Sequence, residues 1–177
     1  MKKIKLLTSS VFVIFLSVII TSCKNEPSAE CVQLKTASKQ LADNLKMYET
    51  TWDKIINQRQ IDQINETNFD KNITLVTSPE NIVGIEGFKD YYNNYLIGFS
   101  NVTFTIVDVF GQGDKIVKHW NFKGTHSGEF FGIPATNKEV NVDGVTLVKM
   151  KDGKIAQEQD FFDNLEFMQQ LGLIPRE

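Results

Sequence analysis

The sequence predicts an α+β domain in which helices come first and hairpin-linked strands follow. In the first half of the chain, apolar residues recur at the spacing of amphipathic helices, over 41–55 and again over 88–99. In the second half, β-rich runs alternate with tight glycine-containing turns. The part of the chain from about residue 40 to residue 177 has room for one domain with one core.

The N-terminus has the pattern of a secretory signal. Three lysines precede a nearly unbroken apolar run over 6–20, which is shorter than the roughly 20 residues of a membrane-spanning helix. The residues that follow, Ile20-Thr-Ser-Cys23, resemble a bacterial lipobox, in which the cysteine is lipidated and becomes the first residue of the mature chain. The alternative is an ordinary uncleaved anchor.

This pattern divides the chain into a lipoprotein signal peptide over 1–22, a polar tether over 23–38 and a folded domain over 39–177. The expected location is the cell envelope, with a lipid anchor at Cys23 in a bacterial membrane, the outer membrane of a Gram-negative cell being preferred. The sequence leaves the choice of membrane and leaflet open.

Charge and cysteine content exclude several classes of function. The chain has 19 Lys and Arg against 22 Asp and Glu, and loss of three lysines with the signal would take the net charge from −3 to −6. Such a domain would repel nucleic acid. Cys31 is the only thiol besides Cys23, and the only histidines are His119 and His126, so we expect no catalytic thiol, no metal site and no cofactor.

The helices of the first half are recognised by their apolar stripes. The stripe of the first helix consists of Leu41, Leu45, Tyr48, Trp52 and Ile55. Residues 60–68 are expected to add a shorter helix, and 73–77 a strand. The aromatic stripe between 88 and 99 predicts a further helix that packs into the core, and one or two of its tyrosines could also line a pocket.

The strands of the second half form two predicted hairpins. The β-rich runs are 102–110 with 115–123, and 139–150 with 155–162. Asp152 and Gly153 favour a two-residue turn with positive φ at both positions in the second hairpin. A short last helix follows, with Asp163 as its cap, Glu166 reaching back to that cap and Gly172 beyond its end.

The register of the second hairpin bears on where a site would lie. With Asp152 and Gly153 as the turn, Val145 would face Asp160 and Leu147 would face Glu158. Neither face of such a sheet would be wholly apolar or wholly polar. This mixture favours a sheet that curls around a cavity containing a few polar groups.

The second half of the chain also resembles a known family. The residues that carry the resemblance are Gly124–Thr136 (GTHSGEFFGIPAT), Asp152–Ile155 (DGKI), Asp160 and Gln169–Gly172 (QQLG). They resemble the SnoaL-like polyketide cyclases, often labelled ester cyclases, of the nuclear transport factor 2-like superfamily. The resemblance covers about residues 45 to 173.

The resemblance implies a cone-shaped fold, in which a strongly curved antiparallel sheet wraps around N-terminal helices and a short C-terminal helix follows. It also implies cofactor-free aldol chemistry with an aspartate of the last strand as acid and base. By position, that aspartate is Asp160, and the family's histidine between two glycines is His126. Phe161 and Thr146 stand where a related cyclase has a tryptophan and another pocket histidine, so the substrate stays open.

The candidate catalytic residues are therefore Asp160 and His126. A carboxylate in an apolar pocket suits the removal of a proton next to a carbonyl, because desolvation makes it a stronger base. The alternative for Asp160 is an exposed aspartate or the partner of a lysine. His126 would polarise the carbonyl or hold Asp160, and its alternative is a structural role at a bend of the strand. The candidate substrate-binding residues are Trp120, Phe122, Phe130 and Phe162.

The sequence thus favours a lipid-anchored domain that binds a small apolar carbonyl compound and performs aldol-type or isomerase-type acid/base chemistry. The alternative is a non-catalytic envelope lipoprotein of the same fold that binds a small ligand or a lipid. A third interpretation is a protein-interaction domain, and a homodimer fits the superfamily. Whether the protein is an enzyme is not decided by the sequence, because one scaffold serves enzymes and non-enzymes.

Overall fold

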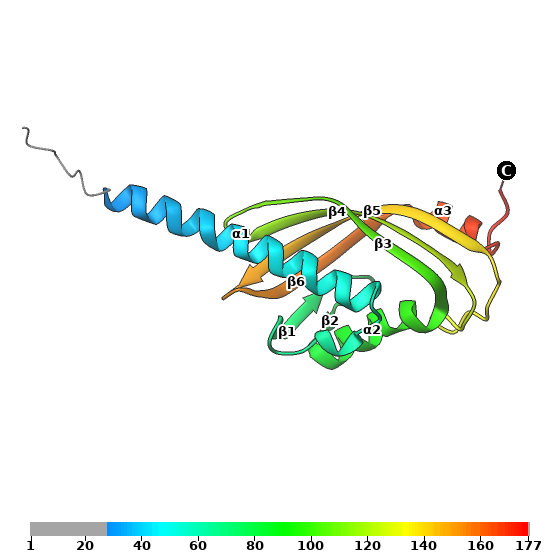
Figure 1. The fold of residues 1–177 in the computed structure, drawn as a ribbon. Coiled ribbons are helices and arrows are strands. Elements are labelled where there is room, and N and C mark those ends of the chain that lie inside the picture. The colour runs from blue at the N-terminus through cyan, green and yellow to red at the C-terminus, as the bar shows by residue number, and fades with distance from the viewer. Residues whose placement is uncertain (1–27, 177) are drawn as a thin grey trace, which may run out of the picture.

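The structure is a computed structural model and describes residues 28–176. The elements are α1 (Ala29–Ile56), the 3-10 helix η1 (Ile61–Gln63), β1 (Phe69–Leu75), β2 (Ile82–Val83), α2 (Ile85–Gly98), β3 (Phe99–Gln112), β4 (Lys115–His126), β5 (Glu139–Lys151), β6 (Lys154–Phe162) and α3 (Asn164–Gln170) (Figure 1). This order confirms the α+β class. The expected signal peptide over 1–22 and Cys23 lie outside the described residues. No helix within residues 28–176 is long and apolar enough to cross a membrane.

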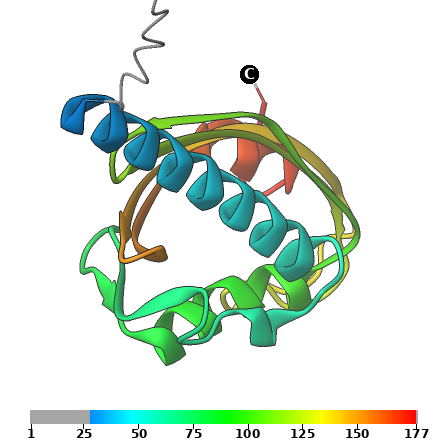
Figure 2. The same ribbon diagram turned by 60° about the vertical axis from the view of Figure 1, so that its left-hand side comes forward.

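The six strands form one curved sheet in the order β2-β1-β6-β5-β4-β3. Neighbouring strands are antiparallel except β1 and β6, which are parallel. The expected curved antiparallel sheet is confirmed, with one parallel pair, because β1 and β6 come from opposite ends of the domain and no hairpin sets their direction. The sheet curls around α1 without closing, and α2 lies across the open side (Figure 2).

Helix α1 is longer than the sequence indicated. It begins at Ala29, where the Ser28 hydroxyl caps it by accepting a hydrogen bond from the Cys31 amide at 3.2 Å. Residues 29–38, expected in the tether, are therefore helical. This part is exposed and extends past the sheet (Figure 1), whereas the predicted stripe with Tyr48 and Trp52 is buried under the concave face. The helix expected over 60–68 is reduced to η1.

A β-bulge decides which side chains of β6 face inward. Asp152 and Gly153 form the predicted turn, with φ of 52° and 75°. Between the pairs Met150–Ile155 and Lys149–Gln157 the register shifts, so Ala156 is an extra residue. Beyond this bulge, Thr146 rather than Val145 faces Asp160, and Val148 rather than Leu147 faces Glu158.

The predicted mixture of polar and apolar residues on both faces is present, but the bulge changes which residues of β6 lie on each face. Along β5 every second residue is buried, in strict alternation from Glu139 to Lys151. The sheet has a buried concave face and an exposed outer face. The extra residue in β6 turns over all side chains that follow it, so these side chains lie on the face opposite to the expected one. The polar groups of interest, Glu158 and Asp160, both belong to the concave face.

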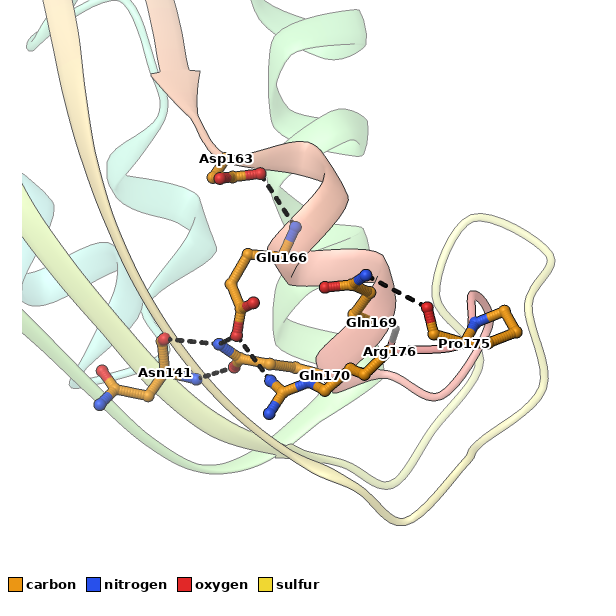
Figure 3. Close-up of polar contacts among 7 residues, drawn as sticks. All are labelled: Asn141, Asp163, Glu166, Gln169, Gln170, Pro175 and Arg176. Carbon is orange, nitrogen blue, oxygen red and sulfur yellow. Dashed lines mark hydrogen bonds and ion pairs between the residues drawn. The ribbon is translucent and has the colours of Figure 1, made fainter.

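Helix α3 closes one end of the sheet through polar contacts with β5 (Figure 3). The Asp163 carboxylate accepts a hydrogen bond from the Glu166 amide at 2.9 Å, which confirms the predicted cap. Glu166 does not reach back; its carboxylate accepts hydrogen bonds from Gln170 and Arg176. The Gln170 side chain bonds both backbone groups of Asn141, so the short helix is fixed to the strand by paired hydrogen bonds.

Candidate active site

A cavity of about 50 Å³ lies between the helices and the concave face of the sheet. Its lining residues are Trp52, Ile56, Tyr92, Tyr95, Phe104, Lys118, Trp120, Phe122, Val142, Asp160, Phe162 and Phe167. Pockets for drug-sized ligands have volumes of roughly 300–1,000 Å³. A ligand that enters this cavity without displacing a lining side chain must therefore be small.

Aromatic rings form most of the cavity wall, and three predicted substrate-binding residues are among them. Trp120 and Phe122 come from β4, and Phe162 comes from the end of β6. The Trp120 ring lies against Gly144, where an added Cβ would be only 2.2 Å from the ring atom Cζ2. Gly144 thus allows the large indole to lie flat against the next strand.

The Asp160 carboxylate also lines the cavity, and two side chains hold it there. Its Oδ1 accepts a hydrogen bond from the Thr146 hydroxyl at 2.5 Å, and its Oδ2 accepts one from the Tyr92 hydroxyl at 2.8 Å. Thr146 Oγ1 in turn accepts a hydrogen bond from Trp120 Nε1 at 2.9 Å. The carboxylate is therefore fixed in direction by donors on β5 and α2.

Glu158 lies two residues before Asp160 and is completely buried. Its Oε1 accepts hydrogen bonds from the Tyr48 hydroxyl at 2.6 Å and from Trp52 Nε1 at 3.0 Å. Burial raises the pKa of this carboxyl from 4.5 to about 7, against the opposing effect of the Lys118 ammonium, and the nearby Asp160 raises it further. Glu158 can therefore hold a proton near neutral pH.

Tyr92 connects the two carboxyl groups. Its hydroxyl oxygen lies 2.8 Å from Asp160 Oδ2 and 3.1 Å from Glu158 Oε2. A tyrosine hydroxyl has one proton and so can donate to only one carboxylate at a time. When Glu158 is protonated, it can donate to the Tyr92 oxygen while Tyr92 donates to Asp160, which completes an unbroken chain of hydrogen bonds between the two acids.

Lys118 brings a buried positive charge to the same wall. Its side chain is 3% exposed, and its Nζ lies 4.4 Å from the ring centroid of Trp52 and 5.3 Å from those of Tyr48 and Phe104. Burial lowers the pKa of this ammonium, and the carboxyls of Glu158 and Asp160 act in the opposite direction. The three aromatic faces also favour the charged form.

His126 and Phe130 do not line the cavity, so the structure does not bring the two predicted catalytic residues together there. The His126 ring is buried near Phe99 and Phe130, and its Nδ1 accepts a hydrogen bond from the Thr136 amide at 3.3 Å. Burial lowers the pKa of the ring. Phe130 packs on Gly98, where an added Cβ would be 2.8 Å from the Phe130 Cβ. His126 thus lies apart from the cavity among aromatic rings, and its buried Nε2 has no hydrogen-bond partner within residues 28–176.

The sequence reasoning missed Lys118, Glu158 and Tyr92 as individual site residues. A signal for two of them was present, because alternate residues of a strand share a face. Lys118 alternates with the cavity residue Trp120, and Glu158 alternates with Asp160. Tyr92 belonged to an aromatic stripe in which no pattern separates core residues from pocket residues.

The chain matches a known protein family over most of its length. The family model described as SnoaL-like polyketide cyclase matches residues 43–171. No curated protein sequence matches the chain.

Several solved structures share the fold. TsrD of Streptomyces laurentii is 24% identical, with a TM-score of 0.67 over 75% of this chain and 97% of that chain. A Jannaschia sp. CCS1 protein named as a SnoaL-like polyketide cyclase is 20% identical, with a TM-score of 0.66 over 76% of this chain and 94% of that chain. A Bacillus cereus protein named as a polyketide cyclase is 26% identical, with a TM-score of 0.61 over 75% and 82% of the two chains.

Proposed function

Because the chain belongs to the family of SnoaL-like polyketide cyclases, we propose that it binds a small apolar carbonyl compound in the aromatic cavity and moves a proton on that compound with Asp160. The observation that supports this most is the Asp160 carboxylate, which is held by Thr146 and Tyr92 at the wall of an otherwise mainly aromatic cavity. An oriented base in a site with little water is what removal of a proton next to a carbonyl requires.

The reaction begins when the Asp160 carboxylate takes a proton from the carbon next to the carbonyl. The electron pair of the broken C–H bond forms the enolate, whose negative charge comes to rest on the carbonyl oxygen. Ring closure by aldol addition and double-bond isomerisation both start with this step, so the proposal covers both reaction types. No cofactor is required, because the aspartate alone accepts the proton and returns it.

Glu158 supports this chemistry as a second proton site behind Asp160. Its pKa of about 7 lets it gain or lose a proton near neutral pH. The Tyr92 hydroxyl lies within hydrogen-bonding distance of both carboxyl groups. A proton taken by Asp160 can therefore leave through Tyr92 to Glu158 without crossing the apolar cavity.

The test is exchange of the protons next to the carbonyl in small ketones such as acetone, butanone and cyclopentanone, followed by proton NMR in D₂O. We expect the protein to accelerate exchange for at least one ketone, and Asp160→Asn to reduce that acceleration by about 100-fold or more. Asp108→Asn is the matched control, because Asp108 is an exposed aspartate on β3. Equal exchange by wild type and Asp160→Asn would refute the proposed role of Asp160.

The second candidate function is binding of a small ligand or lipid without chemistry. The sequence around Cys23 favours it, because ring-closing biosynthesis would be unusual at the cell envelope. Under this alternative, a ketone binds and is released without exchange of its protons. Recovery of an unchanged ligand from the purified protein, with no exchange for any ketone, would select this function.

We further propose that Cys23 is lipidated and anchors the protein to a bacterial membrane. The support is the lipobox-like sequence Ile20-Thr-Ser-Cys23 behind an apolar run. Labelling of the expressed protein with radioactive palmitate tests this, with Cys23→Ala as the comparison and Cys31→Ala as the matched control. Equal labelling of wild type and Cys23→Ala would disprove lipidation at this site.

A further inference from the structure

Lys118 is a buried cation whose hydrogen bonds are not satisfied by the protein. Within residues 28–176, its Nζ donates no hydrogen bond and lies within ion-pair distance of no carboxylate. Its neighbours are instead the faces of Tyr48, Trp52 and Phe104. A buried donor without an acceptor is costly, so this position calls for an acceptor in the adjoining space.

The adjoining space is the candidate active-site cavity. Lys118 and Asp160 both line it, the first from β4 and the second from β6. The surrounding titratable groups are Glu158 on β6, Tyr48 on α1 and Tyr92 on α2, and both tyrosine hydroxyls lie within hydrogen-bonding distance of the Glu158 carboxyl group. The ammonium has no hydrogen-bond or ion-pair partner among the described residues, and Lys118 lines the cavity.

We propose that Lys118 is a second catalytic residue, whose ammonium binds the carbonyl oxygen of the ligand and stabilises the enolate oxygen that forms when Asp160 removes the neighbouring proton. The inference rests on the proposed function and narrows the ligand to a small compound with an enolisable carbonyl group. The step balances without a further reactant. The C–H electron pair becomes the enolate double bond, the carbonyl π pair moves to the oxygen, and the proton moves to Asp160.

The charges at the site fit this assignment. Before the step, the negative charge is on Asp160, and after it the negative charge is on the ligand oxygen next to Lys118. A fixed cation in a site with little water stabilises such a charge without rearrangement. The faces of the aromatic rings around the ammonium favour its charged form, in opposition to the burial that lowers its pKa.

Acetylacetone is the probe for this proposal, because it is small and its enolate absorbs ultraviolet light differently from its neutral forms. We would titrate the purified full chain with acetylacetone across pH and record the amount bound as enolate. Wild type should bind the enolate, and Lys118→Met should weaken enolate binding roughly 30-fold or more, the loss expected when one member of a buried charge pair is removed. Lys123→Met, an exposed lysine on the same strand, is the control and should behave as wild type.

Asp160→Asn separates this inference from the proposed function. It should stop ketone proton exchange yet bind the enolate at least as tightly as wild type, because the amide resembles the protonated acid. Absence of enolate binding by wild type would overturn the inference, and this result does not depend on whether a variant folds. Equal binding of the enolate by Lys118→Met and wild type would also overturn the inference. A covalent enaminone on Lys118, seen as an increase in intact mass, would also overturn it, because the lysine would then act as a neutral nucleophile.

Discussion

Replacement of Glu158 gives the clearest test of the electrostatics of the buried cluster. Burial raises the pKa of this carboxyl from 4.5 to about 7. The folded state therefore holds the proton more tightly than the unfolded chain does. The resulting penalty on folding is absent below pH 4.5, grows as the pH rises and is complete above about pH 7.

The size of the penalty follows from this interval. At about 1.4 kcal/mol per pH unit, the rise from 4.5 to about 7 corresponds to a loss of about 3 kcal/mol of stability. Glu158→Gln resembles the protonated acid in shape. Its carbonyl oxygen can accept from Tyr48 and Trp52, and its amide can donate toward Tyr92, as the protonated acid would. The variant therefore keeps the hydrogen bonds and loses the titration.

The assay is urea denaturation followed by tryptophan fluorescence, from about pH 4 to about pH 8. The free energy of unfolding of wild type relative to Glu158→Gln should fall by about 3 kcal/mol across this range. Taking the difference between the two proteins cancels the titration of groups that they share. Glu49→Gln, at an exposed position of α1, is the control and should leave the pH dependence of wild type unchanged. A difference that is flat, or that rises with pH, would refute the reasoning.

Three further predictions concern the walls and the outside of the sheet. Gly144→Ala should lower the free energy of unfolding by about 1–3 kcal/mol in urea denaturation, because its Cβ would overlap the Trp120 ring; an unchanged value would contradict that contact. Burial lowers the pKa of His126, so the folded state takes up a proton there less readily than the unfolded chain; the free energy of unfolding of wild type relative to His126→Gln should fall as the pH drops below the unfolded value of 6.5, and a flat difference would contradict this. His126→Gln should leave ketone exchange intact, and a loss of exchange would make the histidine a site residue. We also expect a homodimer through the outer face, where Phe110, Leu147 and Phe161 are about half exposed, so Leu147→Glu should shift sedimentation towards the monomer; wild type sedimenting as a monomer would exclude this.

Local chemistry explains which parts of the fold could be predicted from the sequence. Asp152 and Gly153 are residues that tolerate positive φ, and both adopt it in the turn. Asp163 caps α3 through a single contact with the Glu166 amide. In contrast, the extra residue Ala156 has no signature in the chain, since a bulge depends on how two strands pair over their whole length. The predicted register was therefore wrong by one residue.

The candidate site shows a second limit of prediction from the sequence, which concerns distance along a strand. Trp120, Phe122 and His126 do share the buried face of β4, as their alternation predicted. However, a strand rises about 3.3 Å per residue, so His126 lies about 13 Å beyond Phe122. A shared face therefore does not imply a shared cavity. The sequence-based prediction missed the charged residues for a different reason. Lys118 and Glu158 are residue types that are rarely buried, and only their alternation with cavity residues indicated that they belong to the site.

The buried charges also bear on whether the cavity serves chemistry or simple binding. Each charge taken out of water costs several kcal/mol, and apolar residues of similar volume often give a more stable protein. If the pocket only held an apolar ligand, methionine or leucine at Lys118 and Glu158 would give a more stable protein, since both residues are buried beside aromatic side chains. The argument is stronger for Lys118, because no ion pair within the described residues compensates the cost of its burial. The cost is understandable if the ligand supplies the missing acceptor, and an oxygen that becomes negative during the reaction is the acceptor that a buried ammonium stabilises most.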